Sequence, residues 1–134
     1  MNGYQKYKEQ SIYSMSGAEL LVLLYDEALK RMRMAEYALE DKDYGVFDNC
    51  INRTVRIVRY LNSILDMEQP ISQEFRTIYE YLFYDLSAIR AGRERRKEDI
   101  GQIIRVLTEF RDGFEEAGKE VSDVRTVTPK SVTG

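Results

Sequence analysis

Histidine and tryptophan are both absent from this 134-residue sequence, which also contains only one cysteine and two prolines. Without histidine, Ser-His-Asp triads, Cys-His nucleophile pairs and histidine-ligated metal sites are excluded within the chain. The lone thiol, Cys50, has no second cysteine with which to form an internal disulfide or a cysteine metal site. No other titratable residues stand at a recognisable catalytic spacing. We therefore expect a protein that is not an enzyme, with no catalytic residue, no metal and no cofactor.

Long apolar runs and a strong charge imbalance are also lacking. The 20 basic and 23 acidic side chains give a formal net charge of −3, which provides no overall attraction to nucleic acid or to an anionic membrane. No apolar run approaches the roughly 18 residues needed to span a bilayer. The N-terminus "MNGYQKYKEQ" is too polar for a signal peptide. We expect a single cytoplasmic domain with no membrane insertion and no nucleic-acid partner.

The dominant pattern is helical. Apolar residues recur at steps of three and four in four long segments, 17–41, 46–67, 71–91 and 95–121, whereas strand signals are nearly absent. Gly92 is expected to end the third of these helices. The connections are short and the helices similar in length, which predicts an all-α fold, an antiparallel up-down four-helix bundle. The expected core seam of the second helix consists of Phe47, Ile51, Thr54, Val58, Leu61 and Leu65. That of the fourth consists of Ile100, Ile103, Leu107, Phe110, Phe114, Ala117 and Val121.

The two ends of the chain depart from this pattern. Residues 1–15 are polar with interspersed tyrosines, and we expect a short N-terminal helix or arm packed on the bundle. The last stretch, "SDVRTVTPKSVTG", has β-branched and polar residues without a helical period. The sequence thus predicts a helical bundle domain at 1–121, including the arm, and a disordered tail at 122–134.

The predicted helices carry more apolar side chains than one core stripe requires. The six consecutive apolar residues at 20–25 step about 100° around the helix axis, so they point in every direction. The second helix adds Ile57, Tyr60 and Ile64 beside its seam. Wide stripes of this kind are explained either by an irregular core or by a groove that receives another amphipathic helix. Periodicity alone leaves both explanations open.

A basic run, "RAGRERRK", spans residues Arg90 to Lys97 around the turn between the third and fourth helices. Cations near a helix C-terminus complement its dipole, which favours a solvated turn. The same residues also fit a phosphate-binding surface, although no aromatic residues interleave the run.

Five blocks of sequence, taken in order, resemble a known family. "NGYQKYKEQSI", "SGAELLVLLYDEAL", "DNCINRTVRIVRYLNSILDME", "IYEYLFYDL" and "EFRDGFEEA" together resemble the FliS family of flagellar secretion chaperones, over about residues 4–117. The resemblance implies a cytoplasmic chaperone that binds the C-terminal helices of flagellin. In that role it prevents premature polymerisation and keeps the subunit competent for secretion. The resemblance leaves room for other flagellar export components as partners.

The resemblance also implies a set of partner-binding residues. From the arm and the first two helices it supplies Tyr7, Ile12, Leu20, Leu24, Tyr25, Asn49, Ile57 and Leu61. Ile64, from the surplus apolar face of the second helix, completes the expected partner-binding set. Asp26, Arg111 and Asp112 occupy further positions in the matching blocks. The sequence departs from the family pattern at several positions. Gly17 stands where proline is usual, Glu27 where glycine is frequent and Phe114 where tryptophan is usual, and Ile89 and Arg90 replace an Ala-Asn pair.

Two other functions stay open on the sequence. A structural bundle would use the surplus apolar surface to self-associate, and would form a strong, concentration-dependent dimer. A nucleic-acid-binding bundle would use the basic turn from Arg90 to Lys97, and its binding would depend steeply on salt.

Overall fold

The computed structural model describes residues 17–133, with side chains up to Gly118. Within these residues the chain is almost entirely helical and contains no strand, which confirms the all-α class. The elements are α2 (Gly17–Glu40), α3 (Tyr44–Ser63), α4 (Pro70–Gly92), the 3-10 helix η1 (Arg93–Arg96) and α5 (Lys97–Thr133). The predicted arm at 1–15 lies outside the described residues.

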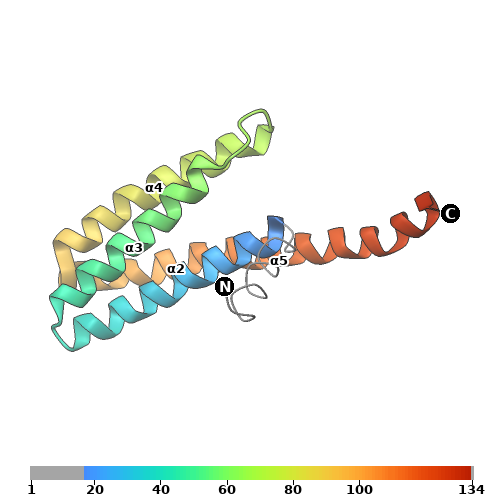
Figure 1. Ribbon diagram of the computed structural model, residues 1–134. Coiled ribbons are helices and arrows are strands. Elements are labelled where there is room, and N and C mark those ends of the chain that lie inside the picture. The colour runs from blue at the N-terminus through green and yellow to red at the C-terminus, as the bar shows by residue number, and fades with distance from the viewer. Residues whose placement is uncertain (1–16, 134) are drawn as a thin grey trace, which may run out of the picture.

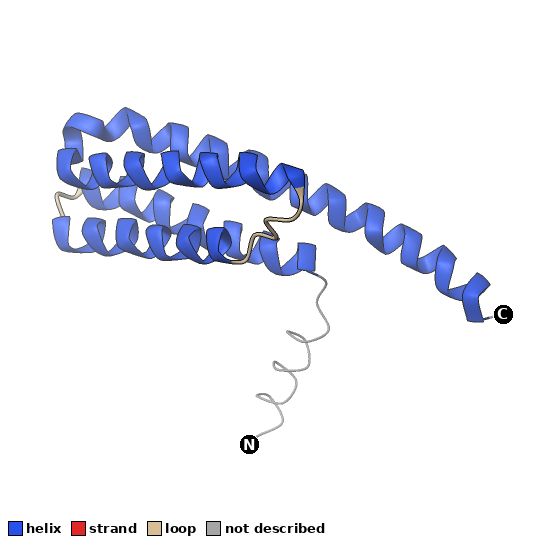
Figure 2. Ribbon diagram, turned by 90° about the horizontal axis from the view of Figure 1, so that it is seen from above, coloured by secondary structure: helices blue, strands red, loops and turns tan. Residues whose placement is uncertain are grey.

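Successive α-helices run in opposite directions, joined by short connections (Figure 1). α2 packs against both α3 and α5, and α4 also packs against α3 and α5. α5 extends well beyond the other helices (Figure 2). Its backbone continues as helix to Thr133, whereas the sequence predicted an irregular tail from residue 122. The division of the chain into domains at residue 121 stays a prediction.

Local side-chain chemistry explains where α3 and α4 begin. Asp43 caps α3, because its Oδ1 accepts a hydrogen bond from the backbone N–H of Val46 at 3.2 Å, and the helix starts two residues before the predicted position. Pro70 opens α4, where its missing N–H leaves no helical hydrogen bond unmade. Buried Ser72 donates its hydroxyl to the carbonyl of Asp66 at 2.6 Å, which anchors the connection from α3.

α4 ends at Gly92, the residue at which the sequence predicted the end of the third helix. Gly92 is the last helical residue, but its φ of −86° is an ordinary right-handed value. The next residue, Arg93, takes a positive φ of 51°. A Cβ on Gly92 would lie only 2.4 Å from Cγ of Arg96. The glycine is therefore needed for the close approach of η1 rather than for its own backbone angle.

The core follows the predicted seams of α3 and α5. The seam residues that the structure buries are Phe47, Ile51, Thr54, Val58, Leu61, Ile100, Ile103 and Leu107. Leu65, Phe110 and Phe114 are half-buried and pack against this core. Ala117, expected in the seam, is exposed, and Val121 lies beyond the described side chains. The one polar member of the buried seam, Thr54, donates its hydroxyl to the carbonyl of Cys50 at 3.0 Å, so it is satisfied within its own helix.

Five aromatic rings join α2, α4 and α5. The ring of Tyr25 stacks on Phe114 with centroids 5.7 Å apart, and Phe75 lies 5.0 Å from Phe110. The hydroxyls of Tyr25 and Tyr79 are 2.5 Å apart and share a hydrogen bond. Burial raises the pKa of both tyrosines, so both stay neutral around pH 7. Tyr25, expected on the partner-binding surface, thus belongs to the interior.

Candidate partner-binding surface

Exposed apolar side chains gather at one end of the molecule, where α2 begins and where α3 connects to α4. These two places lie at the same end because α2 and α3 are antiparallel neighbours. The exposed residues are Leu20, Leu23, Ile64, Met67 and Ile71, and we call this set the apolar end. Ile71 is the most exposed of the five, at 59%. Such side chains gain about 25 cal/mol for each Å² that a partner removes from water, so the set favours docking.

The structure distributes the predicted partner-binding residues over three environments. The exposed members are Leu20, Asn49 and Ile64, and the half-buried members are Leu24 and Ile57. The buried members are Tyr25 and Leu61. The two buried side chains lie in the core and support the surface from below. Asn49 is near the start of α3, far from the apolar end. Tyr7 and Ile12 lie outside the described residues, and the binding role of the whole set stays a prediction.

Three members of the apolar end are absent from the predicted set. Leu23 lies within the apolar run at 20–25, where periodicity could not separate outward from inward positions. Met67 and Ile71 flank Pro70, which interrupts the helical pattern there. Met67 lies in the connection between α3 and α4, where an apolar residue is unusual, and Ile71 lies in the first turn of α4.

The outer face of α4 exposes two tyrosines. Tyr81 and Tyr84 are one turn apart, and they line a shallow hollow of about 430 Å³ together with Thr77 and Glu80. Each ring offers apolar area while its hydroxyl can remain in water. This hollow is a second, smaller surface suited to recognition.

Arg111 ties α5 to α2. Its Nε donates to Oδ1 of Asp26 at 2.8 Å, and its Nη1 donates to Asp112 at 3.1 Å and also to Glu115. The hydrogen bond to Asp26 is the largest cause of the raised pKa of Arg111. The structure thus brings together Asp26, Arg111 and Asp112, three positions that the family resemblance had identified. Because the network is at the surface, solvent screens its contribution to stability.

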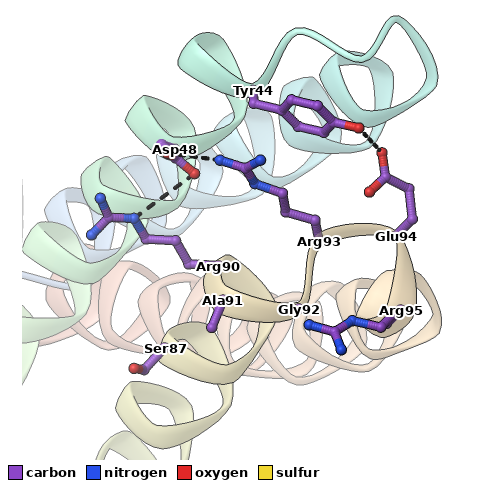
Figure 3. Close-up of a pocket in the computed structure, with 9 residues that line it drawn as sticks. All are labelled: Tyr44, Asp48, Ser87, Arg90, Ala91, Gly92, Arg93, Glu94 and Arg95. Carbon is purple, nitrogen blue, oxygen red and sulfur yellow. Dashed lines mark hydrogen bonds and ion pairs between the residues drawn. The ribbon is translucent and has the colours of Figure 1, made fainter.

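The opposite end of the molecule carries a polar cavity of about 710 Å³ (Figure 3). Its walls come from the first turns of α3, the end of α4 and η1. The lining residues are Tyr44, Asp48, Ser87, Arg90, Ala91, Gly92, Arg93, Glu94 and Arg95. We call this cavity the basic pocket. Most of the basic run noted in the sequence therefore lines a cavity.

Charged contacts cross the basic pocket from α3 to the turn between α4 and α5. The guanidinium of Arg93 lies 4.1 Å from the centroid of the Tyr44 ring, and the Tyr44 hydroxyl donates to Oε1 of Glu94 at 2.5 Å. That hydrogen bond raises the pKa of Tyr44 and lowers the pKa of Glu94. Arg90 Nε and Arg93 Nη2 lie 3.8 and 3.7 Å from the two carboxylate oxygens of Asp48.

Chemical groups for catalysis are sparse in the part of the chain that the structure describes. Residues 17–133 hold no cluster of three or more His, Cys, Asp or Glu side chains that could bind a metal ion. Burial raises the pKa of the Cys50 thiol, which disfavours the reactive thiolate. No described helix has both the length and the apolar character needed to cross a membrane. That the protein lacks catalytic residues, metals and cofactors stays a prediction.

Comparison with known proteins places the chain beside flagellar proteins. The model of the family described as "Flagellar protein FliS" matches residues 1–121. The flagellar secretion chaperone FliS of Bacillus subtilis (strain 168) is 27% identical over 119 residues, which cover 87% of this chain and 86% of that protein. The family match includes the predicted arm, the apolar end and the basic pocket.

Proposed function

The chain belongs to the FliS family of flagellar proteins, and we propose that it is a flagellar export chaperone, acting in the cytoplasm and not as an enzyme. The observation that carries this proposal is the family match over residues 1–121. A relative named as a secretion chaperone, similar along most of both chains, supports the same role.

The proposed partner is the C-terminal region of flagellin, as the family resemblance implies. Holding that region would prevent premature polymerisation and keep the subunit competent for secretion. The apolar end supports such binding, since an amphipathic helix that covered these exposed side chains would gain about 25 cal/mol for each Å² of apolar surface removed from water, before the costs of association and ordering are subtracted. Other export components remain possible further partners.

We further propose that the fold is an up-down four-helix bundle on which the arm at 1–15 packs. The helix directions and the pairwise packing of α2 to α5 support the first part. In the second part, Tyr7 and Ile12 would cover apolar side chains near the start of α2, such as Leu20 and Leu23, in the free chaperone. In the complex, flagellin would replace part of the arm on these apolar side chains.

The test is a calorimetric titration of the full chain with a peptide from the C-terminal region of the cognate flagellin. Ile64 and Val46 form a matched pair, because both are β-branched residues of the α3 region, exposed to 47% and 42%, at opposite ends. Serine in either place is uncharged, so it does not interact with the helix dipole as an acidic residue would. Ile64→Ser should raise the Kd at least about tenfold, the effect of losing one well-buried aliphatic contact, whereas Val46→Ser should not change it.

Two results would contradict this proposal. One is that the folded wild-type chain does not bind the peptide at micromolar concentration. The other is that Ile64→Ser and Val46→Ser weaken binding equally, which would remove the apolar end from the interface.

Self-association is the second candidate, because the apolar end would also suit a second copy of the chain. Sedimentation velocity over a wide concentration range separates the two functions. A strong dimer that Ile64→Ser dissociates, combined with no peptide binding, would favour self-association. The nucleic-acid alternative gains no such support, because the chain carries a net charge of −3 and no aromatic residues interleave the basic run.

A further inference from the structure

We propose that the basic pocket is a binding site for a phosphate group, separate from the apolar end. Arg90, Arg93 and Arg95 line one cavity from the end of α4 and from η1. In Figure 3, Arg90 and Arg93 reach toward Asp48, and Arg95 extends beside Gly92. The planar guanidinium group presents paired N–H donors that match the oxygen spacing of phosphates.

The lining carries a surplus of positive charge, although the chain as a whole is acidic. Three guanidinium groups stand against two carboxylates, Asp48 and Glu94, which leaves the cavity one positive charge in excess. The whole chain carries a net charge of −3. Among the described side chains, Arg95 has no ion-pair partner, whereas Arg90 and Arg93 share Asp48. An anion is therefore attracted to this cavity against the charge of the rest of the protein.

The internal ion pairs leave hydrogen-bond donors available. The distances of 3.8 and 3.7 Å from Arg90 and Arg93 to Asp48 exceed the roughly 3.2 Å upper range of N–H···O hydrogen bonds. Oδ1 of Asp48 is shielded from solvent and accepts no hydrogen bond within the described residues. The oxygens of a phosphate group would accept hydrogen bonds from the free N–H donors. Asp48 would hold the two guanidinium groups in place at the cavity.

The backbone at Arg93 fixes one of these side chains in advance. Its φ of 51° and ψ of −122° form a conformation that residues other than glycine rarely adopt. Residues with such backbone strain cluster at ligand clamps. The Tyr44 ring, 4.1 Å from the Arg93 guanidinium, holds the side chain at the cavity. Little ordering of Arg93 is then left for the ligand to bring about.

The number of donors favours a phosphate over a carboxylate. A carboxylate has two oxygens and fits one guanidinium in the paired geometry, whereas a phosphate monoester offers three terminal oxygens and up to two negative charges. Three arginines line this one cavity, so its donors exceed what a single carboxylate can accept, which suits the larger acceptor. The same group occurs in free pyrophosphate and in a phosphorylated side chain, so the experiment includes both.

The test follows the arginine Nε–Hε signals of the full ¹⁵N-labelled chain by NMR at constant ionic strength. The probes are sodium pyrophosphate, a short phosphoserine peptide and sodium glutarate. Both phosphate probes, or one of them, should shift the signals of Arg90, Arg93 and Arg95 along saturable curves, and the tighter probe identifies the source of the group. Glutarate should bind at least about tenfold more weakly, because each of its carboxylate groups has only two oxygens.

Arg95→Gln and Arg105→Gln are the matched variants. Arg95 lines the pocket without an ion-pair partner among the described residues, and Arg105 is an exposed arginine of α5 outside it. Arg95→Gln should weaken phosphate binding about tenfold, the effect of losing one charge-assisted hydrogen bond, and should leave the thermal midpoint unchanged. Arg105→Gln should bind as the wild type does.

Three results would overturn the site: shifts that do not saturate, equal affinity for glutarate and the phosphate probes, or equal weakening by the two variants. The flagellin peptide titration serves as an independent readout. Arg95→Gln should leave the affinity for that peptide unchanged, so failure of the phosphate site and failure of the chaperone proposal can be told apart.

Discussion

The apolar end and the basic pocket differ in the kind of contact that they offer. At the apolar end, hydrocarbon side chains such as Leu23 and Ile71 are exposed. In the basic pocket, directional contacts join Tyr44 to Glu94 and to Arg93. Apolar burial is non-directional and scales with area, so the apolar end suits a long partner that can settle in several ways. Arginine contacts are directional, so the basic pocket suits one small charged group. The same four helices thus offer two surfaces with different selectivity.

The largest expected effect on stability comes from a substitution in the core beneath the apolar end. Leu61→Ala should lower the free energy of unfolding by about 2–5 kcal/mol, because it leaves a cavity at a fully buried position. Ile64→Ala, less than one turn further along the α3 region, should lower it by less than about 1 kcal/mol, since that side chain is half in water. Urea unfolding measures both. Equal losses would show that Ile64 belongs to the core.

A smaller effect is expected at the buried tyrosine pair that supports the apolar end. Tyr79→Phe leaves the Tyr25 hydroxyl buried without its partner and should lower the free energy of unfolding by about 1–3 kcal/mol. Replacing both tyrosines by phenylalanine should restore part of that loss, because no buried hydroxyl is then left unpaired. The double variant losing as much as the sum of the single variants would contradict this account.

These two predictions also show what the sequence could and could not provide. The seams of α3 and α5 were predictable, because Ile51, Val58 and Ile103 recur at the steps that keep one face inward. Within the run at 20–25 the same rule failed. Tyr25 is buried against Phe110 and Phe114 and is hydrogen-bonded to Tyr79, 54 residues away, and no local pattern predicts such distant partners.

The basic pocket was still less predictable. The cluster of cations was visible in the sequence, but a turn and a cavity give the same local pattern. The cavity arises because α3 places Tyr44 and Asp48 opposite the end of α4. The positive φ at Arg93, immediately after Gly92, is likewise a feature that no local pattern in the sequence predicted.

The smallest effect is expected from the Tyr44–Glu94 hydrogen bond, which is exposed. Because the pKa of Glu94 is lowered in the folded chain, its contribution is present above the ordinary glutamate value of 4.5 and is lost as the pH falls through the lowered value. Because the pKa of Tyr44 is raised, its contribution is present below 10.0 and is lost as the pH rises through the raised value.

The thermal midpoints of the wild type and Tyr44→Phe, measured from acidic to alkaline pH, check this prediction. The wild type should have the higher midpoint between those two limits, and the two curves should converge on either side. A difference that does not vary with pH would mean that the hydrogen bond to Glu94 is not its source.

The most direct test of the central claim, that the apolar end receives flagellin, is a methyl NMR spectrum of the full chain with and without the C-terminal flagellin peptide. The account predicts large, saturable shifts for the methyl groups of Leu20, Leu23, Ile64 and Ile71, and none for Val46 at the opposite end of α3. Shifts at Val46 with no change at the apolar end would contradict it.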